Sequence, residues 1–450
     1  MKIRMPENVG SIIGMLEKNG YTAYAVGGCI RDSVMGKTPH DWDICTSARP
    51  EEILSALGKH NVIESGLKHG TVTVNYGKEL YEITTYRTDG KYLDNRRPES
   101  VRFITSLKDD LARRDFTVNA MAYNCQDGLC DFFGGTNDIE NKIIRCVGDP
   151  DQRFNEDALR ILRALRFASK LGFAIEEKTK AALKRNAKLL NNISVERIAS
   201  ELIQILDGEF AETVLLEYTD VLGVFLPEIL PAVGLEQRNP HHVYDVWTHT
   251  VKVVIHSPHG KVMRLAALLH DIAKPLCFTV DARGIGHFKG HPEVGAEMAQ
   301  RILKRMHFDN DTIYRVGTLI RYHDRRPILE PKYIRRLISA VGTEAFIPLM
   351  QLKRADTMGQ NPATIPEKLH YIACLEEMFR EFTEDGSEYN IKTLDITGSE
   401  LIALGIGEGK EIGRILHELL EMVIDGKIEN NKEVLLSEVN RHINTSVPPA

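Results

Sequence analysis

The segment Tyr24–Thr46 places a strand, a glycine pair and a short helix in succession, and this order constrains the fold more than any other feature. The apolar run ends at Gly27 and Gly28, and the expected helix then carries Arg31. Glycines permit positive φ and close backbone approach, while the N-terminus of a following helix offers oriented N–H groups and partial positive charge. A glycine pair alone is most often only a turn. This one is also a candidate phosphate site, with Gly28 and Arg31 as contacts.

Two acidic residues, Asp41 and Asp43, follow this helix on either side of Trp42. We expect them in a strand, where the alternation of side chains puts both carboxylates on one face. Such a pair can hold Mg²⁺ against a nucleoside triphosphate, although an isolated pair with this spacing is more often a solvated strand end. Glu82, in the later β-rich run 80–86, is a candidate third carboxylate or an ordinary surface residue.

Hydrophobic periodicity divides the chain into a mixed first part and a helical remainder. β-rich runs and shorter helical stretches alternate in residues 1–150, whereas apolar residues from about Arg153 onward recur at helical spacing. The sequence therefore predicts an α+β fold. Because 450 residues exceed what one hydrophobic core usually serves, we expect several structural units.

Composition excludes some classes of partner and site. The formal net charge of −6 gives no overall attraction to nucleic acid or to an anionic membrane, so any such binding must be local. No apolar stretch is long enough for a membrane span, and the N-terminus does not read as a signal peptide. Seven scattered cysteines form no CxxC pair, which favours a reducing cytoplasm and argues against a cysteine-based zinc site.

Six motifs in fixed order carry a family resemblance: VGGCIRD, HDWDICTSA, GLKHGTVTV, YEITTYRTDG, DNRRPESVRF and RRDFTVNAMAYN. Together they resemble the bacterial class II CCA-adding tRNA nucleotidyltransferases, relatives of bacterial poly(A) polymerases. The resemblance implies a polymerase-β-like nucleotidyltransferase head (1–150), a helical neck (151–210), a helical body (211–380) and a tRNA-binding tail (381–450). It also implies tRNA, ATP and CTP as partners, with Mg²⁺ held by Asp41 and Asp43.

The RRDFTVNA motif stands before what we expect to be an apolar helix. Taken alone, Arg113, Arg114 and Asp115 could be a charge cluster at a helix start. The resemblance implies that Arg114 contacts the bound nucleotide and that Asp115 recognises its ribose.

The segment RFNEDALRILRALRF carries charges at helical spacing, which normally indicates a salt-bridged solvated face. Asp157 and Arg160 would be neighbours on that face. A carboxylate accepts hydrogen bonds and a guanidinium donates them in a fixed fork, so the two can imitate the edge of a base. The resemblance implies that they read incoming CTP or ATP, and that Arg163 and Arg166 also line the nucleotide site. Protein would then replace a nucleic-acid template.

The loop between these motifs, TDGKYLDNRRPESVRF, bears on which nucleotides are added. In the family it assists the change from CTP to ATP selection and is shortened in enzymes that add only CC. Its apparent completeness, with Asp94, Arg96 and Arg97, favours full CCA addition. A CC-adding or A-adding specificity stays an alternative.

A second constellation is rich in histidine. Imidazole and carboxylate groups suit a divalent transition metal or Mg²⁺, and one or two ions there could activate water for attack on phosphorus. The order of the residues resembles HD-domain phosphohydrolases, and implies an HD module at about 240–360 that hydrolyses phosphate esters, for example at RNA ends. The six candidate metal ligands are His249, His270, Asp271, His291, His323 and Asp356.

The sequence therefore leaves three candidate functions. The first is a CCA-adding nucleotidyltransferase with an HD module, whose tail presents Gly405, Gly407, Gly409 and Lys410 to tRNA phosphates. The second is chiefly an HD phosphohydrolase with a nucleotide-sensing head. The third is an RNA-binding protein with degenerate sites. The intact carboxylate pair favours the first, and the sequence leaves the oligomeric state open.

Overall fold

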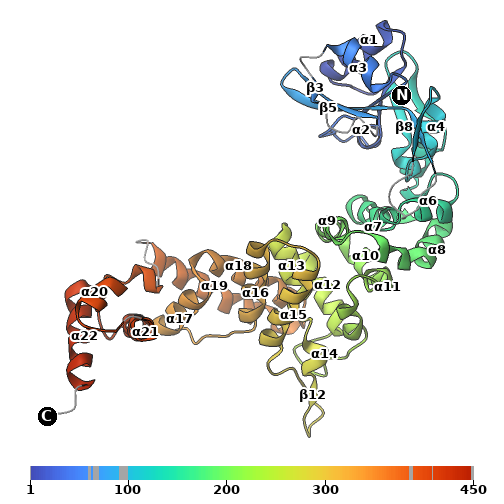
Figure 1. Cartoon of the computed structure of the whole chain (residues 1–450). Helices are drawn as coiled ribbons and strands as arrows, with labels where there is room; N and C mark the ends of the chain where they lie inside the picture. The colour runs from blue at the N-terminus through green and yellow to red at the C-terminus, as the bar shows by residue number, and fades with distance from the viewer. Residues whose placement is uncertain are drawn as a thin grey trace. The chain divides into compact units, whose positions relative to one another are not determined.

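The structure, a computed structural model, describes residues 2–58, 62–63, 70–90, 100–384, 389–407 and 409–446. It divides into two compact units, Met1–Pro227 and Glu228–Ala450 (Figure 1). The loop residues Asp94, Arg96 and Arg97, expected to assist nucleotide selection, lie outside the described residues.

The first unit is built on a mixed seven-stranded sheet with the order β3-β4-β5-β2-β1-β8-β9. β2 and β5 are parallel, and the other neighbouring pairs in the sheet are antiparallel. β1 is buried along its whole length, which matches its continuous apolar sequence. The strands are β1 Ala23–Val26, β2 Ile44–Thr46, β3 Val62–Ile63, β4 Thr71–Tyr76, β5 Glu79–Thr85, β8 Met121–Asn124 and β9 Gly128–Asp131, with the small pairs β6 Arg87–Asp89 and β7 Val101–Phe103, and β10 Ile143–Ile144 and β11 Ala174–Ile175.

Helices complete the first unit. α7 has the apolar stripe expected from its helical spacing, because Ile161, Leu162 and Leu165 are fully buried. The helices are α1 Glu7–Lys18, α2 Gly28–Val34, α3 Pro50–Leu57, α4 Leu107–Ala112, α5 Gly135–Glu140, α6 Pro150–Glu156, α7 Leu159–Leu171, α8 Glu177–Asn186, α9 Val195–Leu206, α10 Ala211–Glu217 and α11 Thr219–Leu222. The combination of sheet and helices confirms the predicted α+β class.

Two local expectations were wrong. Asp41 and Asp43 precede strand β2 and do not lie in it, so strand alternation does not set the directions of their side chains. The RRDFTVNA motif does not begin an apolar helix. A single 3-10 turn, Thr117–Asn119, leads into β8, because the buried run that follows is paired with β1 and β9.

The second unit is helical. α12 and α18 pack against each other and against α13, while α15 and α16 form a second closely packed pair. Near its C-terminus, α20, α21 and α22 enclose a separate core of leucine, isoleucine and valine side chains. Among the described residues, no helix has the length and apolar character needed to cross a membrane. The elements are α12 Val246–His256, α13 Lys261–Leu269, α14 Lys274–Cys277, β12 Thr279–Val280, β13 Gly286–His287, α15 His291–Arg305, α16 Asn310–Tyr322, α17 Pro331–Val341, α18 Thr343–Met358, α19 Ile365–Thr383, α20 Gly398–Ala403, α21 Lys410–Ile424 and α22 Lys432–Ser446.

Candidate functional site

The glycine turn after β1 faces two guanidinium groups. Gly27 caps α2 with φ +85°, a conformation that side-chain-bearing residues rarely adopt. A Cβ atom on Gly27 would lie 3.1 Å from Nη1 of Arg114, and one on Gly28 would lie 3.7 Å from Nη2 of Arg31. The turn therefore combines close backbone approach with positive charge, which suits a phosphate group.

Asp43 is close enough to Asp41 and Glu82 for their charges to affect its carboxylate. Ile44 of β2 pairs with Ile83 of β5 in parallel register, so Asp43 and Glu82 stand at the preceding positions of neighbouring chain segments. The pKa of Asp43 is raised, first because neighbouring atoms exclude water from its carboxylate, while Arg114 lowers it and the charges of Glu82 and Asp41 raise it further. A bound cation relieves the repulsion that the charges of Glu82 and Asp41 exert on the Asp43 carboxylate.

A chain of hydrogen bonds joins α2 to α7. Arg31 Nη1 donates to Asn119 Oδ1 at 2.7 Å, and Asn119 Nδ2 donates to Asp115 Oδ1 at 3.4 Å. Arg163 donates to the other oxygen of Asp115 from Nε at 2.8 Å and from Nη2 at 2.5 Å. Burial opposes the charge on Asp115, but the attraction of Arg163 outweighs it and lowers the pKa of Asp115 to about 2. Asp115 is therefore a charged, buried anchor between the two helices.

Asp157 and Arg160 are close in the chain but hold different partners. α6 ends at Glu156 and α7 begins at Leu159, so the two residues lie at a helix junction and not on one continuous helix face. The Asp157 carboxylate accepts from the backbone N–H of Leu159 at 3.1 Å and lies 3.3 Å from Arg197. The expectation of two neighbours on one helical surface was wrong because the helix is interrupted between them.

Arg160 is buried and donates three hydrogen bonds. It donates to Glu156 Oε2 at 2.9 Å, to the carbonyl of Arg153 at 3.2 Å and to the carbonyl of Arg113 at 2.8 Å. These contacts fix the guanidinium beside the RRD motif. Glu156 therefore has a positioning role that the sequence did not reveal.

The structure adds residues that sequence reasoning missed. Asn119 bridges Arg31 and Asp115, while Glu201 of α9 lies 3.1 Å from Arg166 Nε. Phe167 lies beneath the guanidinium groups of Arg31 and Arg166. Asn119 stands inside the RRDFTVNA motif and Phe167 ends the segment RFNEDALRILRALRF, whereas Glu201 lies outside every motif.

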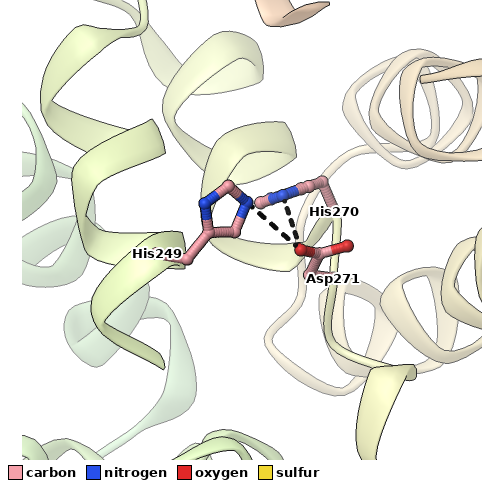
Figure 2. A group of neighbouring side chains, drawn as sticks. All are labelled: His249, His270 and Asp271. Carbon is pink, nitrogen blue, oxygen red and sulfur yellow. Dashed lines mark ion pairs between the residues drawn. The ribbon is translucent and has the colours of Figure 1, made fainter. Parts of the chain in front are cut away.

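The second unit gathers all six predicted HD residues around one centre. Figure 2 shows His249 of α12 directed toward His270 and Asp271, which follow the end of α13. Asp271 Oδ2 lies 3.0 Å from Nε2 of His270 and 3.4 Å from Nε2 of His249. Asp356 Oδ1, from α18, lies 3.0 Å from Nε2 of His249. These four residues are among the six candidate metal ligands named from the sequence.

The other oxygen of Asp271 faces the remaining two histidines. Oδ1 lies 3.3 Å from Nε2 of His291 and 3.7 Å from Nε2 of His323. The Nε2 atoms of the two histidines are themselves 3.4 Å apart. His287, close to His291 in the chain, pairs with Asp281 at 3.0 Å on an exposed hairpin and does not join this cluster. Five of the six residues thus form two groups that share Asp271, and Asp356 joins the cluster through His249.

Backbone contacts orient the four imidazoles. Each Nδ1 atom lies 2.7 to 3.0 Å from a backbone carbonyl oxygen, which accepts only from an N–H group. A proton therefore stays on Nδ1, and Nε2 is the atom that faces the centre, as in metal-ligating histidines. The contacts join His249 to Gly359, His270 to Ala267, His291 to Phe288 and His323 to Ile320.

Several buried atoms of the cluster lack a hydrogen bond, which bears on whether the cluster can hold a metal ion. Both carboxylate oxygens of Asp271 and the Nε2 atoms of His249 and His270 lack a hydrogen bond of acceptable geometry among the described residues. Buried polar atoms without partners are costly, and nitrogen and carboxylate donors suit a divalent transition metal. The residues therefore fit one or two such ions. Without an ion, Asp271 and Asp356 raise the pKa of His249 to about 9 against the effect of burial.

A cavity of about 780 Å³ opens beside this cluster. Lys274, buried in its wall, lies 2.7 Å from Asp271 Oδ2 and donates to Gln237 Oε1 at 2.8 Å. Arg321 and Arg326 also line the cavity. Its walls therefore combine candidate metal ligands with cationic groups that attract a phosphate.

Comparisons with known proteins cover most of the chain. Three family models match: the poly A polymerase head domain over residues 23–145, the probable RNA and SrmB-binding site of polymerase A over 172–233, and the putative tRNA nucleotidyltransferase domain 2 over 291–439.

Individual relatives agree with these matches. The chain is 33% identical to the CCA-adding enzyme of Enterococcus faecalis over 443 residues, which cover 95% of this chain and 93% of that protein. It is 51% identical to the CCA-adding enzyme of Lactobacillus helveticus over 194 residues, and this match spans about half (48%) of that enzyme. The solved structure of the Bacillus stearothermophilus CCA-adding enzyme in complex with CTP has 29% sequence identity and a TM-score of 0.71, and covers 98% of this chain and 99% of that one.

Proposed function

The chain belongs to the CCA-adding enzyme family, and from that premise we propose that it adds CCA to the 3′ end of tRNA from CTP and ATP. The 3′-hydroxyl oxygen of tRNA forms a bond to the α-phosphorus of the nucleotide, and pyrophosphate leaves. The observation that carries the proposal is the convergence of the glycine turn, the acidic residues and the arginines of α2 and α7 in the first unit. Positioning and electrostatic stabilisation are then the main contributions of the protein.

Each group in that convergence has a proposed role. Asp41 and Asp43 hold Mg²⁺, with Glu82 as a third carboxylate. The ion, when bound, neutralises phosphate charge and favours deprotonation of the attacking hydroxyl. Gly28 and Arg31 bind phosphate oxygens.

The nucleotide itself is recognised by the RRD motif and the helix junction. Arg114 contacts the nucleotide, Asp115 its ribose, and Asp157 and Arg160 its base. Arg197 lies 3.3 Å from the Asp157 carboxylate, and Arg160 donates to Glu156 at 2.9 Å. These contacts fix which atoms of Asp157 and Arg160 face the base. The arginines that also line the site are Arg163 and Arg166.

The division into head, neck, body and tail at residues 150, 210 and 380 is part of the same proposal. The tail binds tRNA through Gly405, Gly407, Gly409 and Lys410. Gly405 and Gly409 have φ of +90° and +113°, and a Cβ atom there would meet nothing within 4 Å. Open backbone of this kind suits contact with phosphates.

One assay tests the nucleotidyl transfer. The purified protein is incubated with Mg²⁺ and tRNA transcripts that end before CCA, after C or after CC, with CTP and ATP singly and together, and the 3′ ends are sequenced. When CTP and ATP are supplied together, we expect every transcript to be completed to CCA. Addition that stops at CC, or A added only to CC, would reassign the specificity, and no addition at all would contradict the proposal.

The second unit supports a further function, a metal-dependent phosphohydrolase of the HD type. The observation that favours it is the buried cluster of Asp271, His249 and His270, with atoms that lack a hydrogen bond of acceptable geometry, beside a cavity with cationic walls. The residues fit a divalent transition metal, which when bound supplies an activated water. Two assays test this function: opening of 2′,3′-cyclic phosphates of RNA to monoesters, and release of phosphate from terminal monoesters, both expected to be lost in Asp271→Asn. Retained hydrolysis in that variant would place the activity elsewhere.

A further inference from the structure

Three guanidinium groups surround the ring of Phe167. The Cζ atoms of Arg166, Arg31 and Arg163 lie 4.6, 5.3 and 5.6 Å from the ring centroid. Arg163 and Arg166 belong to α7 together with Phe167, whereas Arg31 comes from α2 beside the glycine turn. One aromatic ring therefore joins the candidate phosphate contact of α2 to the arginines of α7.

Each arginine of this group has a carboxylate close to it. Arg163 pairs with Asp115, Arg166 lies near Glu201, and Arg31 pairs with the adjacent Asp32. Burial lowers the pKa of the Arg166 guanidinium, Glu201 opposes this, and Arg163 and Arg31 lower the pKa further, as expected where like charges are crowded. The negative face of an aromatic ring attracts cations and so reduces the cost of holding them together.

The ring itself is fixed. Phe167 is 8% exposed and packs edge-on against Phe116, with ring centroids 5.8 Å apart and an interplanar angle of 82°. Phe116 follows Asp115 directly and donates its backbone N–H to the Asp115 carboxylate at 2.8 Å. Movement of Phe167 would therefore disturb both the arginine group and the Asp115 anchor.

We propose that Phe167 is a positioning residue for nucleotide binding, which holds Arg31, Arg163 and Arg166 in place to receive the triphosphate. This rests on the proposed nucleotide-binding role of the arginines. The ring acts through the arginines and contacts no base, so CTP and ATP are affected equally. Loss of the ring weakens nucleotide binding and leaves the rate at saturating nucleotide nearly unchanged.

Steady-state kinetics with the full-length protein and tRNA ending before CCA or after CC test the proposal. In Phe167→Leu, KM for CTP and for ATP rises about tenfold while kcat stays within about twofold, and Phe167→Tyr restores KM. Phe173→Leu is the matched control, because Phe173 is similarly buried at 5% exposure and no cation lies over its ring among the described residues.

Fluorinated phenylalanines at position 167 separate the electrostatic role from packing. Each added fluorine weakens the negative face of the ring with little change in shape, so KM should rise stepwise from phenylalanine to the pentafluoro form. A flat series, a loss confined to kcat, or an effect on one nucleotide only would overturn the proposal. An unsubstituted protein that adds no nucleotide would instead contradict the proposed function itself.

Discussion

Arg163 donates two hydrogen bonds to the buried carboxylate of Asp115, 48 positions earlier in the chain. The ion pair joins the RRD motif to α7, and through Asn119 it extends to Arg31 beside the glycine turn. A change at Asp115 should therefore affect both the stability of the first unit and the binding of nucleotide.

We predict that Asp115→Asn lowers the free energy of unfolding of the first unit at neutral pH. The pKa of Asp115 is about 2 in the folded protein and 3.8 ordinarily, which corresponds to about 2 kcal/mol. Because the folded pKa is depressed, this contribution is present above pH 3.8 and is lost as the pH falls toward 2. Urea unfolding at several pH values checks this, and a difference between variant and wild type that does not shrink at low pH would contradict it.

Nucleotide addition should depend steeply on the carboxylates before β2. We expect Asp41→Asn or Asp43→Asn to lower kcat/KM for CTP by about 100-fold to 1,000-fold, because each removes a charge placed to hold a cation against the reacting phosphate. Glu140→Gln is the control, an exposed carboxylate at the end of α5 in the same unit. Primer-extension kinetics measure all three variants, and normal addition in either aspartate variant would remove it from the metal site.

The sequence predicted the strand, the glycine turn and α2 well because these depend on local conformation. It misplaced Asp41 and Asp43 in a strand, since β2 begins only at Ile44, where the pairing with β1 and β5 starts. It also treated Asp157 and Arg160 as neighbours on one helix. Asp157 lies at the break between α6 and α7, 3.3 Å from Arg197, and helical periodicity does not record such a tertiary partner.

For the histidine cluster, in contrast, the sequence grouped residues that lie far apart in the chain. Residues more than one hundred positions apart, such as His249 and Asp356, come together at 3.0 Å, and their chemical type and order were enough to group them. What the sequence did not show is how they are held. The backbone carbonyls that orient each Nδ1 atom belong to helix ends and loops, and any residue type can supply a carbonyl.

The glycine turn gives a prediction about backbone conformation. Gly27→Ala should raise KM for CTP and ATP by about tenfold or more, because its φ is +85° and the new Cβ would lie 3.1 Å from Nη1 of Arg114. Gly14→Ala, inside α1 with nothing within 4 Å of its Cβ position, should leave KM unchanged and stabilise the helix by about 0.5–1 kcal/mol. Steady-state kinetics and thermal unfolding compare the two, and equal KM values in both variants would argue against a phosphate-binding turn.

Metal stoichiometry tests the sharing of Asp271 between two groups. With Asp43→Asn as background to suppress binding in the first unit, we expect two Mn²⁺ ions per chain in the second unit after gel filtration. His249→Gln should lose one ion, since His249 belongs to the first group only, and His323→Gln should lose the other. Asp271→Asn should lose both, because Oδ2 faces one group and Oδ1 faces the other. Elemental analysis by mass spectrometry gives the counts.

His287→Gln serves as the control for this series, because His287 pairs with Asp281 on the exposed hairpin and lies outside both groups. It should retain two ions.

Asp271→Asn on the wild-type background should add CCA at the normal rate, since the proposed nucleotidyl transfer uses none of the histidine cluster. If Asp271→Asn retained two ions, the Asp271 carboxylate would not be a ligand shared by the two groups. Nucleotide addition lost together with the ions would instead show that the two activities depend on one another.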